Sequence, residues 1–548
     1  MKKTGNRICG FRKKTLCLAV VTALAISPFS VLSGCGSAET STAVSNTTSS
    51  GLSQTASSEI LDDSLLDDSH VTYVDVQETP GIDEFVEKLS AVEGLSDVHK
   101  DEFGFVTGYI EQPLDWQTDT GKTFKQQFSI DFKGADLPVC YSVGGYSLMT
   151  SMSDYSLFPE DYAHNAVRIE YRFFGESRPE GLDNDSVDMW EYLTVENAAE
   201  DIHSLISKIS TVLTGKRVMT GASKGGFTTN YQAYKYPEDA DLFIPFCAPL
   251  CDSASDTRMY DFLNYSVGDD VIGTEKAAEA RGAILDFQVE CMRYKNDLKS
   301  LYKASAIELN TEGENGYRSH LLEDDGAKLY DTAVADLPGC VWSSLGNYPE
   351  YATADQLISY FGDIVAMPVS TDEEVSAKKE AILNALSAFC SPGGYACSDD
   401  TNMLPYIIQS LMQMGNYEID LTPLRERIAE EQAKDPSFPD LSFTVEEEKT
   451  AYITAFLTDE QIELGSQFSF VHDELVEWEK TTNANVLMVF GGVDPWTSVA
   501  IPECDNPSVK RILVKSSDVY EMIGHSASVS TFDEESMNTI YDALNELK

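Results

Sequence analysis

The sequence has few basic residues for its length. Its 548 residues include 39 Lys and Arg against 90 Asp and Glu, which gives a formal net charge of −51 at pH 7. Such a charge opposes binding to the phosphates of nucleic acids and to anionic lipid surfaces. We therefore expect no nucleic-acid partner. We interpret the acidic residues either as a solubilising surface or as a field that attracts cationic substrates, such as peptides with free amines.

Motifs of several enzyme classes are also missing. The sequence has no Gly-x-x-x-x-Gly-Lys-Ser/Thr loop, no His-Glu-x-x-His motif, no dinucleotide-binding fingerprint and no Cys-x-x-Cys pair. We therefore expect neither a cofactor nor a metal. Eight cysteines follow residue 35. They either form disulfides or remain buried thiols, and we expect Cys390 and Cys397 to be the first pair to be bridged.

The N-terminus resembles a bacterial lipoprotein signal peptide. A basic stretch, Lys2 to Lys14, precedes an apolar run, Leu16 to Leu32, which is short for a membrane-spanning helix. The four residues that end at Cys35, Leu-Ser-Gly-Cys, resemble the lipobox. We therefore expect residues 1–34 to be removed and Cys35 to be lipidated, which would anchor the protein on the extracytoplasmic face of the cell membrane. Residues 35–69, rich in Ser, Thr and Ala, are expected to form a flexible tether.

Strand and helix patterns alternate in two parts of the chain. A helix over Thr194 to Ile209 has apolar residues on one face and lies between two expected strands. This alternation is typical of a mostly parallel, doubly wound α/β sheet. The expected strands are Phe105 to Glu111, Phe124 to Phe132, Leu137 to Val143, Val167 to Phe174, Arg217 to Thr220, Asp241 to Phe246, Asn485 to Phe490 and Val509 to Val514.

Between these two parts the pattern is largely helical. We interpret this segment as a large insertion, so that residues 70–251 and 481–548 form one α/β core around a helical cap of residues 252–480. A final helix over Glu534 to Leu547 is expected to cover the sheet. The expected helices of the cap include Glu275 to Leu301, Glu374 to Phe389, Leu424 to Ala433 and Val445 to Leu457.

One turn of the expected core carries the pattern of a nucleophile elbow. Gly221-Ala222-Ser223-Lys224-Gly225 follows the strand Arg217 to Thr220 and precedes a helix with aromatic residues on one face. Gly-x-Ser-x-Gly between a strand and a helix lifts a serine hydroxyl clear of the sheet. The motif therefore predicts Ser223 as a nucleophile.

A serine nucleophile needs a base within hydrogen-bond reach and an acid that orients the base. In doubly wound hydrolases these groups follow along the chain in the order Ser, acid, His. Asp494 lies just past the expected strand Asn485 to Phe490, and His525 is the only histidine after Asp494. Their order and placement predict a triad of Ser223, His525 and Asp494.

The oxyanion formed by such a triad needs N–H donors. The N–H of Lys224, next after the nucleophile, is the first candidate. The second is the N–H of Gly145 or of Tyr146, in the loop after the strand Leu137 to Val143, and the sequence leaves the choice between them open. The side chain of Lys224 is expected to lie in solvent.

With these motifs in view, the chain resembles the secreted bacterial tripeptidyl-aminopeptidase family of serine peptidases, which is related to lysosomal prolyl carboxypeptidase. The resemblance implies an α/β-hydrolase core with a helical cap. It also implies a serine exopeptidase that releases short peptides, tripeptides in particular, from free N-termini. The matching segments are Ile169 to Pro179, Tyr192-Leu193-Thr194, Gly221 to Gly226, Asp494-Pro495-Trp496 and His525.

Glu170 and Arg172 lie in the first of these segments and are candidate substrate-binding residues. A carboxylate there would receive the ammonium group of a peptide substrate. The alternative is a structural ion pair between Glu170 and Arg172 or a neighbour.

Two other functions fit the same features. A carboxylic-ester hydrolase would use the same triad, and a surface-binding lipoprotein would keep the hydrolase fold without turnover. Comparing hydrolysis of a tripeptide anilide with that of a short acyl ester distinguishes an ester hydrolase from a peptidase. Labelling of Ser223 by a fluorophosphonate distinguishes an active hydrolase from a surface-binding lipoprotein without turnover.

Overall fold

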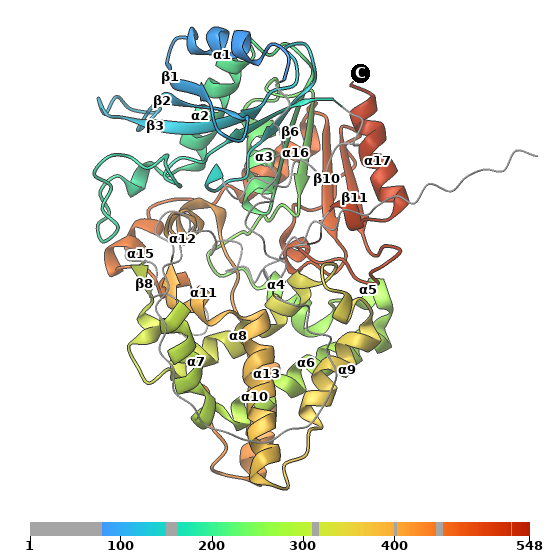
Figure 1. Cartoon of the computed structure of the whole chain (residues 1–548). Coiled ribbons are helices and arrows are strands. Elements are labelled where there is room, and N and C mark those ends of the chain that lie inside the picture. Colours follow the sequence, from blue (N-terminus) through green and yellow to red (C-terminus); the bar gives the residue numbers. More distant parts are fainter. Residues whose placement is uncertain are drawn as a thin grey trace, which may run out of the picture.

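A nine-stranded sheet combines segments from distant parts of the chain (Figure 1). This computed structural model describes residues 79–148, 163–309, 317–398, 403–444, 453–525, 527 and 529–547. The expected signal peptide, the tether and Cys35 lie outside the described residues.

The strand order in the sheet is β1-β2-β3-β5-β4-β6-β7-β10-β11. The pairs from β1 to β5 are antiparallel, and the pairs from β5 to β11 are parallel. The strands are β1 Leu95–Lys100, β2 Val106–Pro113, β3 Thr123–Asp131, β4 Val139–Ser142, β5 Asn165–Ile169, β6 Arg217–Ala222, β7 Leu242–Phe246, β10 Val486–Gly491 and β11 Val509–Val514. From β4 the chain first passes to β5 on one side of that strand and later returns to β6 on its other side. The carboxyl end of β4 is therefore a topological switch point, the place where α/β proteins commonly bind ligands.

Successive side chains of the inner strands point to opposite faces of the sheet, so apolar strands make both faces apolar. Helices cover both of these faces. In β7, Phe243 packs in one hydrophobic cluster, whereas Leu242 and Ile244 pack in another. The first cluster includes α1 (Ile82–Ser90), α2 (Val195–Ile209), α3 (Lys224–Lys235) and α16 (His472–Thr481), and the second includes α17 (Glu534–Asn545). The predicted doubly wound α/β fold is confirmed.

Most of the segment between β7 and β10 forms a body of helices below the sheet in Figure 1, and we call its residues 252–480 the cap. Its last helix, α16, lies on the sheet instead. Its hydrophobic core is continuous with buried residues of the sheet's loops, among them Tyr146, Phe174 and Trp496. The cap therefore packs directly on the loops that leave the sheet. Its described helices below the sheet are α4 Arg258–Tyr265, α5 Asp269–Ile272, α6 Thr274–Arg293, α7 Lys295–Leu309, α8 Ala327–Ser344, α9 Ala354–Val365, α10 Asp372–Phe389, α11 Pro392–Ala396, α12 Met403–Gln409, α13 Thr422–Lys434 and α15 Asp459–Gly465. The strands β8 Tyr317–Arg318 and β9 Cys397–Ser398, far apart in the chain, form a separate antiparallel pair.

Two expectations about the cap were wrong. The helix expected over Glu275 to Leu301 is two helices, because the chain turns at Tyr294 and the next residue, Lys295, reaches a buried carboxylate. Cys390 is a free, buried thiol that faces Cys340, so the expected bridge to Cys397 is not formed. The helix expected over Val445 to Leu457 lies largely outside the described residues.

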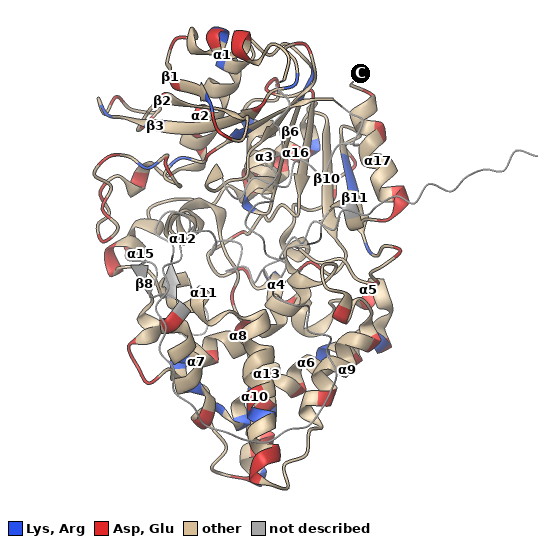
Figure 2. Ribbon diagram, in the orientation of Figure 1, with Lys and Arg blue, Asp and Glu red and all other residues tan. Residues whose placement is uncertain are grey.

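Acidic side chains are spread over both the sheet and the cap (Figure 2). Among the described helices, none combines the length and the apolar character that crossing a bilayer requires.

Candidate active site

Ser223 occupies a sharp turn between β6 and α3. Its backbone has φ 57° and ψ −122°, a conformation that costs a residue other than glycine of order 1–3 kcal/mol. Small neighbours make the turn possible: a Cβ on Gly221 would lie 2.5 Å from the carbonyl oxygen of Gly225, and one on Gly225 would lie 2.7 Å from that of Val143. The turn thus has the geometry of a nucleophile elbow, with strain concentrated at Ser223.

The predicted acid and base are in contact. The Nδ1 atom of His525 lies 3.1 Å and 3.0 Å from the two carboxylate oxygens of Asp494. Asp494 is fully buried just past β10, and its Oδ1 accepts a hydrogen bond of 2.9 Å from the N–H of Trp496. This arrangement leaves Nε2 of His525 as the ring nitrogen for a proton from the nucleophile.

β7 connects Ser223 to this pair. The N–H of Ser223 donates to the carbonyl of Phe246, the last residue of β7. The following residue is Cys247, whose Sγ lies within 4.8 Å of a carboxylate oxygen of Asp494 and a ring nitrogen of His525. All these groups therefore gather at the carboxyl edge of neighbouring parallel strands.

The loop after β4 lies against the first turn of α3. Gly145 has φ 78°, and a Cβ there would lie only 3.0 Å from the N atom of Gly225 and from Cγ of Lys224. The N–H of Lys224 opens α3, so it has no acceptor within the helix. The close approach places the loop of Gly145 and Tyr146 beside this N–H, as two oxyanion donors would require.

The side chain of Lys224 is buried, which corrects the expectation that it lies in solvent. Its Nζ lies 3.2 Å from the ring centroid of Tyr171 and 4.8 Å from that of Phe174. Among the described residues, none accepts a hydrogen bond from this Nζ. Burial lowers the pKa of Lys224 well below its ordinary value, because an apolar surrounding disfavours the charged form.

Glu170 and Arg172 are both buried, but they do not pair with each other. One carboxylate oxygen of Glu170 accepts from the Ser177 hydroxyl at 2.7 Å and the other from the N–H of Leu148 at 3.0 Å. Glu170 thus fixes the chain just after Tyr146 to the end of β5.

The guanidinium of Arg172 pairs with Asp201 at 2.7 Å, and both side chains are fully buried. Its remaining donors go to the carbonyls of Pro113, Leu114 and Tyr192. Every N–H of this arginine is therefore used within the fold, which leaves none for a substrate.

Comparison with known proteins identifies the family. A model of the PS-10 peptidase S37 family matches residues 79–436. The chain belongs to this family. It is therefore a serine peptidase, and the resemblance drawn from its motifs is confirmed at this level.

The prolyl tri/tetrapeptidyl aminopeptidase of Streptomyces mobaraensis is 28% identical to this peptidase over 268 residues, which make up 48% of this chain and 52% of that protein. The peptidase thus spans about half the length of this relative. Solved structures are more distant. The peroxisomal α/β-hydrolase Lpx1 of Saccharomyces cerevisiae is 10% identical with a TM-score of 0.33, covering 81% of this chain and 88% of that one. GrgF, an α/β-hydrolase from Penicillium sp. sh18, is 10% identical with a TM-score of 0.32, covering 81% and 98%.

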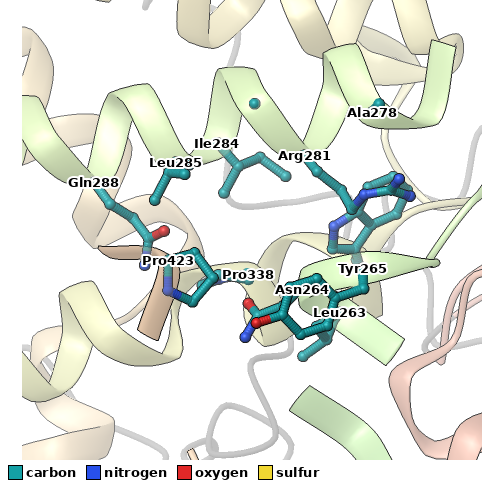
Figure 3. Close-up of a pocket in the computed structure, with 12 residues that line it drawn as sticks. Leu263, Asn264, Tyr265, Ala278, Arg281, Ile284, Leu285, Gln288, Pro338 and Pro423 are labelled. Carbon is teal, nitrogen blue, oxygen red and sulfur yellow. The ribbon is translucent and has the colours of Figure 1, made fainter. Parts of the chain in front are cut away.

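A cavity of about 350 Å³ opens among α4, α6, α8 and α13 of the peptidase (Figure 3). None of its lining residues is a candidate site residue. Arg281, at its wall, donates to the carboxylate of Asp269 and to the carbonyl of Val267, so this charge is used within the cap. Trp342, one of the lining residues, packs its carbonyl oxygen against Gly524, the residue before His525.

In the described part of the peptidase, one group of three potential metal ligands occurs: Cys247, Asp494 and His525. Two of its members form the acid–base pair described above, so a metal bound there would occupy the ring of the base. Cys247 was not among the predicted site residues, although its position directly after β7 is the signal that would have found it.

Proposed function

We propose that this S37 peptidase is an extracytoplasmic serine exopeptidase that releases short peptides, tripeptides in particular, from free N-termini. The observation that carries the proposal is the combination of a strained Ser223 with a buried Asp494–His525 pair on the other side of β7. Backbone strain at a serine that shares a sheet edge with an oriented histidine is typical of a site built for nucleophilic attack.

In the proposed reaction, Oγ of Ser223 attacks the scissile carbonyl carbon while its proton passes to Nε2 of His525. Asp494 keeps Nδ1 of the ring protonated and stabilises the imidazolium. The N–H of Lys224, together with that of Gly145 or Tyr146, binds the oxyanion. The imidazolium then protonates the leaving amine, and water attacks the acyl-enzyme by the reverse of these steps.

The cap supports the choice of an exopeptidase. The ring of Trp496 lies 5.5 Å from that of Tyr417 in the cap and 6.1 Å from that of His525. The N–H of Gly524 also donates to the carbonyl of Leu345, just after α8. Cap residues thus pack directly around the histidine loop, which favours substrates that enter by a chain end. A tripeptide product is proposed by analogy with the Streptomyces relative, a prolyl tri/tetrapeptidyl aminopeptidase.

Mass spectrometry of the products from a defined set of peptides tests this function. We expect removal of tripeptides from free N-termini, no cleavage of N-acetylated peptides, and faster turnover of a tripeptide anilide than of a short acyl ester. Ser223→Ala should lose about 10⁴- to 10⁶-fold in kcat, whereas Ser207→Ala, at an exposed position of α2, should not. Activity retained by Ser223→Ala would rule out the triad, and preference for the ester would make the protein an esterase.

We further propose that lipid at Cys35 anchors the peptidase to the membrane, with the lipobox-like sequence as support. The full chain, expressed in a bacterium, should fractionate with membranes and be released by detergent. Cys35→Ala should shift it to the soluble fraction without loss of peptidase activity. Membrane association that survives this substitution would contradict the anchor.

A further inference from the structure

The side chain of Tyr146 reaches the nucleophile. Its phenolic hydroxyl lies close enough to the side chain of Ser223 for the two groups to interact. Tyr146 is 8% exposed, so this hydroxyl belongs to the enclosed part of the site. Tyr146 is therefore a side-chain neighbour of the nucleophile.

The ring of Tyr146 is held from several sides. Phe174 meets it edge-on with centroids 5.8 Å apart, and Tyr406 of the cap lies 6.0 Å away. Nζ of Lys224 lies 5.7 Å from the same ring. On the main chain, the carbonyl of Tyr146 accepts from the N–H of Tyr171 at 3.0 Å. Such packing fixes where the hydroxyl points before substrate arrives, which is what electrostatic stabilisation of a transition state requires.

The hydroxyl also keeps its proton. Burial raises the pKa of Tyr146 well above the ordinary value, and this outweighs the opposing contact with Ser223. A phenol of this kind stays a hydrogen-bond donor throughout the pH range in which the imidazole of His525 can act as a base.

We propose that the phenolic hydroxyl of Tyr146 donates a hydrogen bond to the oxyanion and so acts as a catalytic residue beside the N–H of Lys224; this inference rests on the proposed triad. When Oγ of Ser223 bonds to the carbonyl carbon, the electron pair of the C=O π bond moves to the carbonyl oxygen. That oxygen and Oγ then share one carbon, so a hydroxyl that lies close to Oγ in the free enzyme is within reach of the oxyanion. The phenol keeps its proton, and no proton transfer is needed.

Tyr146→Phe tests the proposal because it keeps the ring and removes only the hydroxyl. We expect kcat on a tripeptide anilide to fall about 100- to 1,000-fold, the cost of one oxyanion donor, with KM changed less than about threefold. A tripeptide aldehyde, which forms a hemiacetal with Ser223, should bind more weakly by a similar factor. The tripeptide product should bind as to wild type.

Tyr171→Phe is the matched control. Its ring belongs to the same aromatic group, but its hydroxyl accepts from Gln409 of the cap at 3.0 Å and not from the nucleophile. We expect little change in kcat for this variant. An equal loss in both variants would reduce Tyr146 to a packing residue, and unchanged kcat or aldehyde affinity in Tyr146→Phe would also overturn the proposal.

Thermal unfolding and fluorophosphonate titration of active sites separate folding from chemistry in both variants. If Tyr146→Phe does not fold, 3-fluorotyrosine at this position provides a second test. It preserves the shape and acidifies the phenol, so activity should be lost at lower pH on the alkaline side than in wild type. An unshifted alkaline limit would contradict the role of the hydroxyl. A wild type that cleaves neither peptide nor ester would instead remove the proposed function itself.

Discussion

The sheet edge and the cap differ in how each holds a buried lysine. In the cap, Nζ of Lys295 donates to the carboxylate of Asp331 at 2.6 Å, to the carbonyl of Asp440 at 2.7 Å and to the hydroxyl of Ser442 at 2.9 Å. At the sheet edge, Nζ of Lys224 faces aromatic rings, and no described residue accepts a hydrogen bond from it. The first lysine has three acceptors for its ammonium group, and the second has none among the described residues.

The difference matches the roles of the two regions. A buried ion pair with every donor used connects α7 to α8 and to the chain after α13, so it fixes how the cap helices pack. At the sheet edge, the amine without an acceptor among the described residues belongs to Lys224, the residue directly after the strained Ser223. Sites for chemistry retain such unfavourable features because the rest of the fold stabilises them. We therefore expect substitutions at the edge to change activity and those in the cap to change stability.

The largest effect is expected at the acid of the site. Asp494→Asn keeps the acceptor for Trp496 N–H but no longer enforces the tautomer of His525. We expect kcat to fall about 10⁴-fold, with an unfolding midpoint close to that of wild type. Asp473→Asn, at a fully exposed position of α16, is the control. A loss of stability in place of activity would remove the distinction between the two regions.

In the cap, the expected effect is on stability. Lys295→Met leaves the fully buried Asp331 without its cation, which costs about 3–5 kcal/mol of the free energy of unfolding. Urea denaturation measures this loss, and kcat per fluorophosphonate-labelled site should stay within twofold of wild type. Adding Asp331→Leu should restore more than half of the stability, since the stranded carboxylate is then gone. A single variant as stable as wild type would contradict the assigned role of the pair.

These cases also show what sequence alone could predict. The elbow at Ser223 is a local pattern, and the rule that parallel strands end at one edge led from it to Asp494 and His525, which the structure places in contact. Their catalytic roles stay predictions. The burial of Lys224 could not be predicted, because its aromatic neighbours come from the loop after β5 and from that after β4. The break before Lys295 likewise depends on Asp331, which is 36 residues away.

Glu170 offers a test through pH. Burial raises its pKa to about 7, against hydrogen bonds from Ser177 and from the N–H of Leu148. Because the folded pKa lies above the unfolded value of 4.5, the folded state holds this proton more tightly than the unfolded chain does. Its contribution to stability therefore falls by about 3 kcal/mol as pH rises from about 4.5 to about 7, and is constant above that.

Glu170→Gln should remove this part of the pH dependence. The free energy of unfolding, measured in urea at several values between pH 5 and pH 8, should decline less for the variant than for wild type. Glu87→Gln, at an exposed position of α1, should follow wild type. Parallel curves for all three proteins would mean that Glu170 ionises as easily in the fold as in the unfolded chain.

The smallest effect is expected at Lys224 and completes the comparison of the two lysines. Lys224→Met removes an amine that has no acceptor among the described residues and replaces it with a thioether, which packs well against Tyr171 and Phe174. Since no hydrogen bond is lost, we expect the free energy of unfolding to change by less than about 1 kcal/mol, or to rise. The same urea measurement on Lys295→Met provides the contrast. A loss of more than about 2 kcal/mol in Lys224→Met would mean that its amine is stabilised as strongly as the paired cation of the cap.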